Sequence, residues 1–198
     1  MKARKNFICL LIMVSMFISF VTPVFAQVKT EERFITKSIE YLEPEDNDGI
    51  YLIENIMIDG KDYTFIHRET ETEKTIEISG AENEVISFNK ISEEIKAKKH
   101  INLLNSGWTY FGPETFRVSW GKGASAAVIA SAIAVVAGGP VGVFFGAAGA
   151  LAGVSIGCTV IKSGKYKIEG THVEGHYKSE IYDPQGGYIT TVHWSGRR

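Results

Sequence analysis

The chain has 198 residues and a formal net charge of −2, from 21 Lys and Arg against 23 Asp and Glu. Because this balance comes without a recognisable nucleic-acid-binding motif, a nucleic acid is excluded as an expected partner. The charge is uneven: residues 27–106 carry 18 acidic and 10 basic residues, a net charge of −8, whereas residues 107–198 carry 5 and 8, a net charge of +3. Such asymmetry indicates a membrane or polyanion partner for the basic half. Ordinary surface variation explains it equally well.

The first 26 residues have the pattern of a secretory signal peptide. Three basic residues come first: Lys2, Arg4 and Lys5. An uncharged apolar stretch follows at residues 7–20, and the Val-Phe-Ala sequence at residues 24–26 suits cleavage before Gln27. We therefore expect a secreted protein, with an uncleaved N-terminal anchor as the alternative. Since Cys9 lies in this segment, Cys158 is the one cysteine expected in the mature chain, and we expect no intrachain disulfide.

Residues 27–106 are predicted to form an acidic β-rich domain, a candidate pro-region or solubilising region. Its first apolar residues are compatible with a short helix or a strand: Phe34, Ile35, Ile39 and Leu42. From Ile50 apolar residues alternate, and Asp59-Gly60 is a strong hairpin-turn signal. Residues 63–68, 74–79 and 84–88 continue this pattern as an antiparallel meander. A helix predicted at residues 92–104 has the spacing to cover its apolar face.

Residues 107–123 form an aromatic segment, predicted as a linker before the apolar region. Five aromatic side chains crowd into it: Trp108, Tyr110, Phe111, Phe116 and Trp120. Such a cluster beside an apolar span is typical of the interfacial belt of membrane proteins. Strands of a β layer that caps a core are the alternative.

The most unusual stretch is residues 124–161, which contain no charged side chain and are bracketed by Lys122 and Lys162. This run is nearly twice the roughly 20 residues that cross a bilayer as a helix. Gly138, Gly139 and Pro140 interrupt it with strong turn chemistry. We therefore predict a helical hairpin, with arms at residues 124–137 and 141–161.

The second arm carries glycines at four-residue spacing: Gly142, Gly146, Gly149, Gly153 and Gly157. On a helix these positions lie along shared faces, and such rows of small residues let helices pack closely in lipid. The alternative is a buried core hairpin in a soluble protein. Only one amphipathic helix is available to cover the hairpin, so oligomers, lipid or the β layers must cover the rest.

Residues 162–198 are predicted to form a small antiparallel β unit. Val173, Tyr177 and Ile181 share one face of the first strand, residues 183–187 form a turn, and residues 188–194 pair back. The polar face carries the one set of side chains with metal-ligand character: His172, Glu174, His176 and, from the neighbouring strand, His193. A zinc site is conceivable there, but the polar face of an exposed strand explains the same residues.

The expected fold class is α+β, with an antiparallel meander and one helix, a Gly-rich hydrophobic hairpin and a small C-terminal β unit. No catalytic nucleophile or phosphate-loop motif is present. We therefore expect neither an enzyme nor a cofactor.

The uncharged hairpin, with its flanking Trp108, Trp120, Lys122, Lys162 and Lys165, resembles the Gly/Ala-rich helices of secreted Gram-positive bacteriocins. It is also similar to the hairpin of pore-forming colicins, although the amphipathic helices that surround that hairpin are lacking. The resemblance implies a toxin that permeabilises a target bacterial membrane, with a lipid bilayer, further copies of itself and an immunity protein as partners. The alternative is a non-toxic envelope protein anchored by the same hairpin.

Overall fold

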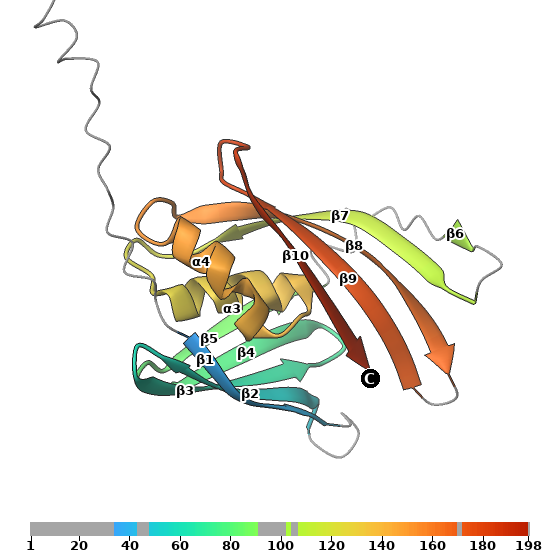
Figure 1. The fold of residues 1–198 in the computed structure, drawn as a ribbon, viewed down its shortest axis with the longest axis horizontal. Coiled ribbons are helices and arrows are strands. Elements are labelled where there is room, and N and C mark those ends of the chain that lie inside the picture. The colour runs from blue at the N-terminus through green and yellow to red at the C-terminus, as the bar shows by residue number, and fades with distance from the viewer. Residues whose placement is uncertain (1–33, 43–47, 91–101, 104–106, 170–171, 198) are drawn as a thin grey trace, which may run out of the picture. The chain divides into compact units, whose positions relative to one another are not determined.

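The computed structural model describes residues 34–42, 48–90, 102–103, 107–169 and 172–197. The predicted signal peptide, residues 43–47, and residues 92–101 and 104 of the predicted helix lie outside these ranges. The described residues form two antiparallel five-stranded sheets with a short helical segment between them (Figure 1). The fold is α+β in the broad sense, with strands dominating.

The N-terminal sheet is a meander in which each strand pairs with the next along the chain. Its strands are β1 (Phe34–Tyr41), β2 (Ile50–Ile58), β3 (Lys61–Glu69), β4 (Glu73–Gly80) and β5 (Glu84–Asn89). Asp59 and Gly60 join β2 to β3 with φ angles of 49° and 79°, the left-handed conformation that a two-residue hairpin requires. The predicted meander is therefore confirmed, and the undecided first segment is a strand.

The C-terminal sheet has the order β10-β9-β8-β7-β6. Its strands are β6 (Asn102–Leu103), β7 (Thr109–Ser119), β8 (Gly157–Glu169), β9 (His172–Tyr182) and β10 (Tyr188–Arg197). The predicted pairing of residues 188–194 with the strand before them is confirmed. The prediction of a linker at residues 107–123 is wrong, because most of that segment is β7 and pairs with β8.

The helical segment, residues 126–151, is inserted between β7 and β8. It consists of α3 (Ala126–Ala137), a 3-10 turn η2 (Val141–Phe144) and α4 (Phe145–Leu151). The first predicted arm and the turn are confirmed. The predicted second arm at residues 141–161 is wrong, because helix ends at Leu151 and Gly157 begins β8. The predicted helical hairpin is therefore not formed. The cause is strand pairing: Cys158 and Val160 lie opposite Val118 and Phe116 of β7.

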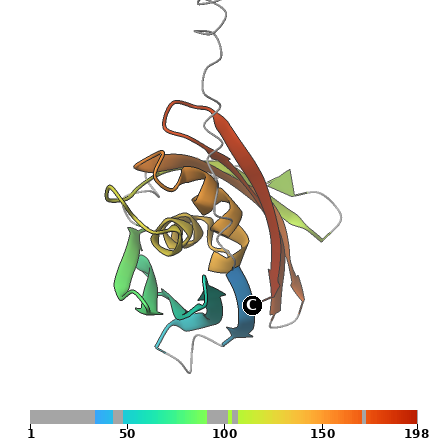
Figure 2. The ribbon, with the colours of Figure 1, turned by 60° about the vertical axis from the view of Figure 1, so that its left-hand side comes forward.

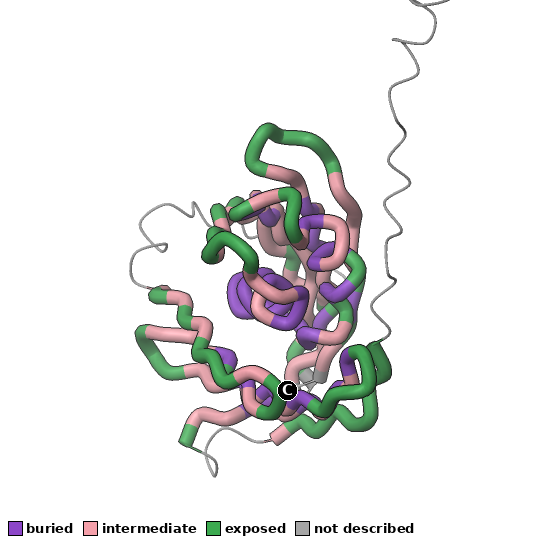
Figure 3. The backbone as a smooth tube through the Cα atoms, turned by 90° about the vertical axis from the view of Figure 1, so that its left-hand side faces the viewer, coloured by how far each residue is buried: buried purple, intermediate pink, exposed green. Residues whose placement is uncertain are grey.

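The two sheets cover the helical segment from opposite sides (Figures 1 and 2). Ile76 and Ile78 of β4 share one core with Ile129 and Ile133 of α3 and with Val160 of β8. Buried residues are concentrated in the helical segment and along the strands that face it (Figure 3). The apolar face of the meander is therefore covered by α3. Of the helix predicted at 92–104, residues 102–103 form a strand, and the rest lies outside the described residues. Oligomers, lipid and the β layers were the covers expected for the uncharged stretch, and in this structure the β layers cover it.

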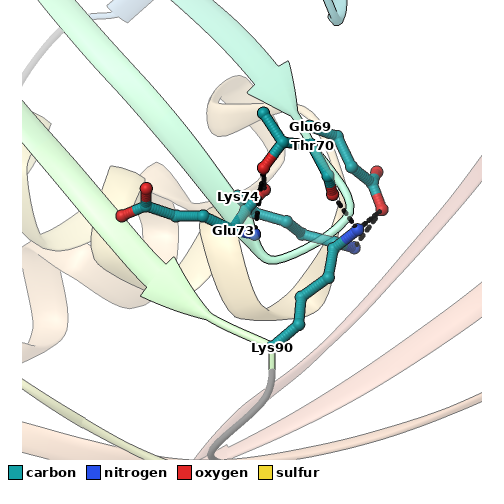
Figure 4. Close-up of polar contacts among 5 residues, drawn as sticks. All are labelled: Glu69, Thr70, Glu73, Lys74 and Lys90. Atoms are coloured by element: carbon teal, nitrogen blue, oxygen red, sulfur yellow. Dashed lines mark hydrogen bonds and ion pairs between the residues drawn. The ribbon is translucent and has the colours of Figure 1, made fainter.

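Polar contacts at one end of the N-terminal sheet link strands that are not neighbours (Figure 4). The Glu69 carboxylate lies 2.8 Å from Lys90 Nζ and 3.6 Å from Lys74 Nζ. Lys90 also donates a hydrogen bond of 2.6 Å to the carbonyl oxygen of Thr70. These contacts join the end of β5 to the β3–β4 turn, so the N-terminal sheet is stabilised by interactions within itself.

Candidate functional site: an uncharged helical segment between two sheets

Helix α3 begins and ends with well-formed caps. Ser125 adopts an extended conformation, and its Oγ accepts a hydrogen bond of 3.3 Å from the backbone N–H of Val128. Gly138 ends the helix with a φ of 75°, a conformation that glycine adopts without steric cost. Eleven of the twelve α3 residues are buried, so the helix presents no polar face to water.

Helix α3 has no acidic residue in its first turn and no basic residue in its last turn, and the two sheets supply charges at its ends instead. At the start, the Ser125 hydroxyl donates a hydrogen bond of 2.6 Å to Glu82, which lies between β4 and β5. At the end, Lys162 Nζ and Lys74 Nζ lie 3.3 and 3.6 Å from the position that a β-carbon would take on Gly138. A carboxylate at the N-terminus and ammonium groups at the C-terminus are the arrangement that a helix dipole favours.

The turn after α3 fits closely against the C-terminal sheet. A β-carbon on Gly139 would lie 2.7 Å from the indole ring of Trp194, so only glycine fits there without movement. Trp194 is itself held between Tyr177 and Phe144, with ring centroids 5.4 Å away in each case. The predicted turn is therefore a packing element of the core.

The most specific polar contact is a fully buried carboxylate at the start of η2. Glu54 of β2 accepts hydrogen bonds from the backbone N–H groups of Val141 (2.5 Å) and Gly142 (3.1 Å). Its Oε1 also lies 2.7 Å from His67 Nε2 of β3, and both side chains are 0% exposed. A carboxylate at a helical N-terminus satisfies N–H groups that have no partner within the helix. Glu54 thus fastens the N-terminal sheet to the helical segment.

The five predicted packing glycines occupy different environments and do not form one row. Gly142 lies against Thr36 and Glu54. Gly146 and Gly149 lie in α4, and Gly153 follows it; at these three positions a β-carbon would meet no atom within 4 Å. Gly157 begins β8, close to the carbonyl oxygen of Val118. In this structure no close helix–helix approach involves them, and their role in lipid stays a prediction.

The predicted interfacial residues are spread along β7: Lys162 lies opposite Glu114 at its middle, and the others lie toward its two ends. Trp120 donates hydrogen bonds to the carbonyl oxygens of Ser155 (from Nε1, 2.9 Å) and Ile156 (from the backbone N–H, 3.0 Å), and Lys122 is exposed nearby in the same connection. Trp108 lies at the opposite end, with Lys165 Nζ 4.6 Å from its ring centre. At about 3.3 Å per residue the 12-residue separation of the two tryptophans corresponds to roughly 40 Å along the strand. They therefore do not form one belt.

The C-terminal strands present the predicted polar face. Glu174 Oε1 lies 3.6 Å from His176 Nε2, and Glu174 also pairs with Lys167 at 3.0 Å. His193 lies opposite Lys178 in the strand register, and the side chain of His172 is outside the described residues. Among the side chains that the structure describes, no three His, Cys, Asp or Glu come together as a metal-binding set.

Three further residues of this face interact with one another. Lys178 donates a hydrogen bond of 2.7 Å to Glu180, which also accepts one from the Tyr182 hydroxyl. The hydrogen bond to Lys178 lowers the pKa of Glu180, and the same contact raises the pKa of Lys178. These half-buried contacts are explained by the position of the three residues on adjacent sites of one strand face.

Sequence reasoning missed Glu54 and Glu82 as contacts of the helical segment, and His67 as the partner of Glu54. A signal for Glu54 was present, because it alternates with Leu52 and Ile56 on the face that becomes buried. A carboxylate in a buried register requires partners. Those partners are backbone groups 87 and 88 residues further along the chain, which no local pattern indicates.

Comparisons of the chain with known protein families, with curated proteins and with solved structures return no match. Among the described residues, no single helix has the length and apolar character needed to cross a membrane. The pair Ala126–Ala137 and Val141–Leu151 meets that test only when taken together, with a bend of 112° between the two parts.

Proposed function

We propose that this is a secreted, membrane-active protein that stores the uncharged helical segment between its two sheets and exposes it to a target bilayer when the N-terminal sheet separates. One observation carries this proposal. In the described part of the chain the two sheets share no strand pairing, and each is a continuous meander. The N-terminal sheet can therefore leave as a unit without breaking a ladder hydrogen bond.

The contacts that close the molecule suit a reversible cover. Side chains of β4 and β5 pack on α3. Two carboxylates of the N-terminal sheet add hydrogen bonds: Glu54 accepts from Val141 and Gly142, and Glu82 accepts from Ser125. In water, separation of the sheets exposes apolar side chains, and each large one costs about 1.5–3 kcal/mol of free energy. The closed form is therefore favoured in water. A bilayer removes that penalty, because its interior is as apolar as the side chains themselves.

The geometry favours partial insertion of the segment over a complete crossing. β7 and β8 pair with each other, so both ends of the segment stay on the same side of the membrane. Helix α3 has 12 residues and is therefore about 18 Å long, against a hydrocarbon core of about 30 Å. We expect a re-entrant segment that disturbs one leaflet, held at the surface by the C-terminal half, whose net charge is +3.

A disulfide between β1 and η2 tests the proposal. A β-carbon on Gly142 would lie 3.3 Å from Thr36 Oγ1. Cysteines at these two positions therefore come within reach of the roughly 3.5–4.5 Å between β-carbons that a disulfide requires. The double variant Thr36→Cys/Gly142→Cys is incubated, oxidised or reduced, with dye-loaded vesicles of equal parts phosphatidylglycerol and phosphatidylcholine. The two single substitutions, Thr36→Cys and Gly142→Cys, are the matched controls.

The proposal predicts that the oxidised double variant releases no dye, that reduction restores release, and that the single variants release dye in both conditions. Equal release by the oxidised and reduced double variant would show that the cover does not open. Absence of release from every variant and from the wild type would show that α3 is an ordinary core helix, and the proposal would be wrong.

A further inference from the structure

Two large apolar side chains project from the short loop that follows α4, residues 152–156, which we call the tip loop. Val154 is 71% exposed and Ile156 is 63% exposed. The loop lies inside the uncharged stretch, so it brings no charge that would oppose entry into an apolar phase. Single exposed apolar residues are normal on protein surfaces. Two on one uncharged loop of five residues require an explanation.

The tip loop is held in a fixed conformation. Trp120 donates hydrogen bonds to the carbonyl oxygens of Ser155 and Ile156, at 2.9 and 3.0 Å. Within the loop, Ser155 Oγ accepts a hydrogen bond of 3.1 Å from the Gly157 N–H, and the Val154 N–H donates one of 3.1 Å to the Leu151 carbonyl. Because the loop is ordered before binding, little conformational entropy remains to be lost on contact.

The charges near the loop lie on neighbouring connections. Exposed Lys122 lies two residues after Trp120. Glu82 and Glu84 line a hollow of about 430 Å³ together with Trp120 and Lys122, and Glu82 is bonded to Ser125. An indole and a lysine beside projecting aliphatic side chains are the combination that membrane–water interfaces favour.

We propose that the tip loop is the site at which the closed protein first enters a lipid bilayer, ahead of the opening described above. This inference rests on the proposed function and adds the surface of first contact. A bilayer is favoured over a protein partner because a stable protein interface buries about 800 Å² on each side. Two aliphatic side chains provide only a small part of that area, whereas an interfacial anchor needs no more than a few such groups.

The experiment measures vesicle binding with the cover held closed. The oxidised Thr36→Cys/Gly142→Cys protein is floated with vesicles of equal parts phosphatidylglycerol and phosphatidylcholine, with and without Val154→Asp/Ile156→Asp. The matched control is Val85→Asp/Ile168→Asp, because Val85 and Ile168 are 65% and 69% exposed and lie in β5 and β8. Dye release by the reduced proteins is measured in parallel.

We expect the tip variant to bind vesicles at least tenfold more weakly and the control variant to bind as the parent does. Equal binding by the tip and control variants would overturn the inference, while dye release by the reduced parent would still support the proposed function. Selective loss of binding in the tip variant, without dye release from any reduced protein, would support the docking site and overturn the opening step. Absence of vesicle binding by the closed parent would also overturn the inference.

Discussion

The carboxylate of Glu54 accepts a hydrogen bond of 2.5 Å from the backbone N–H of Val141, which lies 87 residues further along the chain. The two residues come from different layers, one from the N-terminal sheet and one from the start of η2. Both oxygens of Glu54 are used, because Gly142 donates to Oε2 and His67 lies 2.7 Å from Oε1. This contact is the main polar connection between the acidic sheet and the segment it covers.

Removing this carboxylate should destabilise the protein strongly. Glu54→Leu leaves the buried His67, the buried N–H of Val141 and the part-buried N–H of Gly142 without this acceptor. We therefore expect a loss of about 3–5 kcal/mol in the free energy of unfolding. Glu54→Gln keeps one acceptor oxygen and should lose less, about 1–3 kcal/mol. Urea denaturation measures both. Glu77→Gln, at an exposed position of β4, is the control and should stay within about 0.5 kcal/mol of the wild type. A Glu54→Leu protein as stable as the wild type would contradict the assigned contact.

Two glycine-to-alanine substitutions should have opposite effects. At Gly139 the new methyl group would lie 2.7 Å from the Trp194 ring, so Gly139→Ala should destabilise the protein by about 1–3 kcal/mol. At Gly146 the methyl group meets no atom within 4 Å and lies in helix α4, so Gly146→Ala should stabilise it by about 0.5–1 kcal/mol. Thermal and urea unfolding of the two variants check the pair. The same sign for both would contradict the packing described for the turn.

The start of α3 provides a third test. Ser125→Ala removes the acceptor for the Val128 N–H and the donor to Glu82, so we expect a loss of about 1–2 kcal/mol. The matched control is Ser87→Ala, at an exposed position of β5. Hydrogen exchange at the first turn of α3 should accelerate in Ser125→Ala alone. Equal stability of the two variants would show that the cap contributes nothing.

Alkaline pH should weaken the fold through Cys158. Burial raises the pKa of this thiol from its ordinary value of 9.0 to about 12. Between these values the unfolded chain releases a proton that the folded chain keeps, so stability falls as the pH rises. From about pH 8 to about pH 10.5 the wild type should lose about 2 kcal/mol more than Cys158→Ala. Parallel curves of unfolding free energy against pH for the two proteins would contradict this expectation.

The strands and turns of the N-terminal sheet, and the last strand pair of the C-terminal sheet, were predictable because their signals are local. Alternation with a period of two indicates strands wherever one face is buried, and Asp59-Gly60 supplies the conformation of its own turn. The second helical arm was mispredicted because Gly/Ala-rich apolar sequence carries no clear period. Residues such as Cys158 and Val160 form a strand because β7 lies beside them, and β7 is about 40 residues away in the sequence.

The site was less predictable than the fold because its determinants are contacts between distant parts of the chain. The uncharged stretch and its turn are visible in the sequence, and so is the carboxylate at an inward-facing position of β2. The sequence does not show that Glu54 lies against Val141, or that Gly139 lies against Trp194. For the same reason the sequence did not show that the uncharged stretch is covered on both sides. One sheet comes from the chain before this stretch and the other mostly from the chain after it, and both pack against α3.

The most direct test of the account follows Cys158, which is 3% exposed in the core beneath the helical segment. Its reaction with a thiol reagent is measured at neutral pH with and without phosphatidylglycerol-containing vesicles, and Cys158→Ala is used to subtract the background. When the helical segment leaves β8 to enter the bilayer, this thiol should become exposed and its pKa should return toward the ordinary value, so the account predicts at least a tenfold faster reaction with vesicles. Dye release at an unchanged, slow rate of Cys158 labelling would contradict the claim that the helical segment leaves its place between the sheets on the membrane.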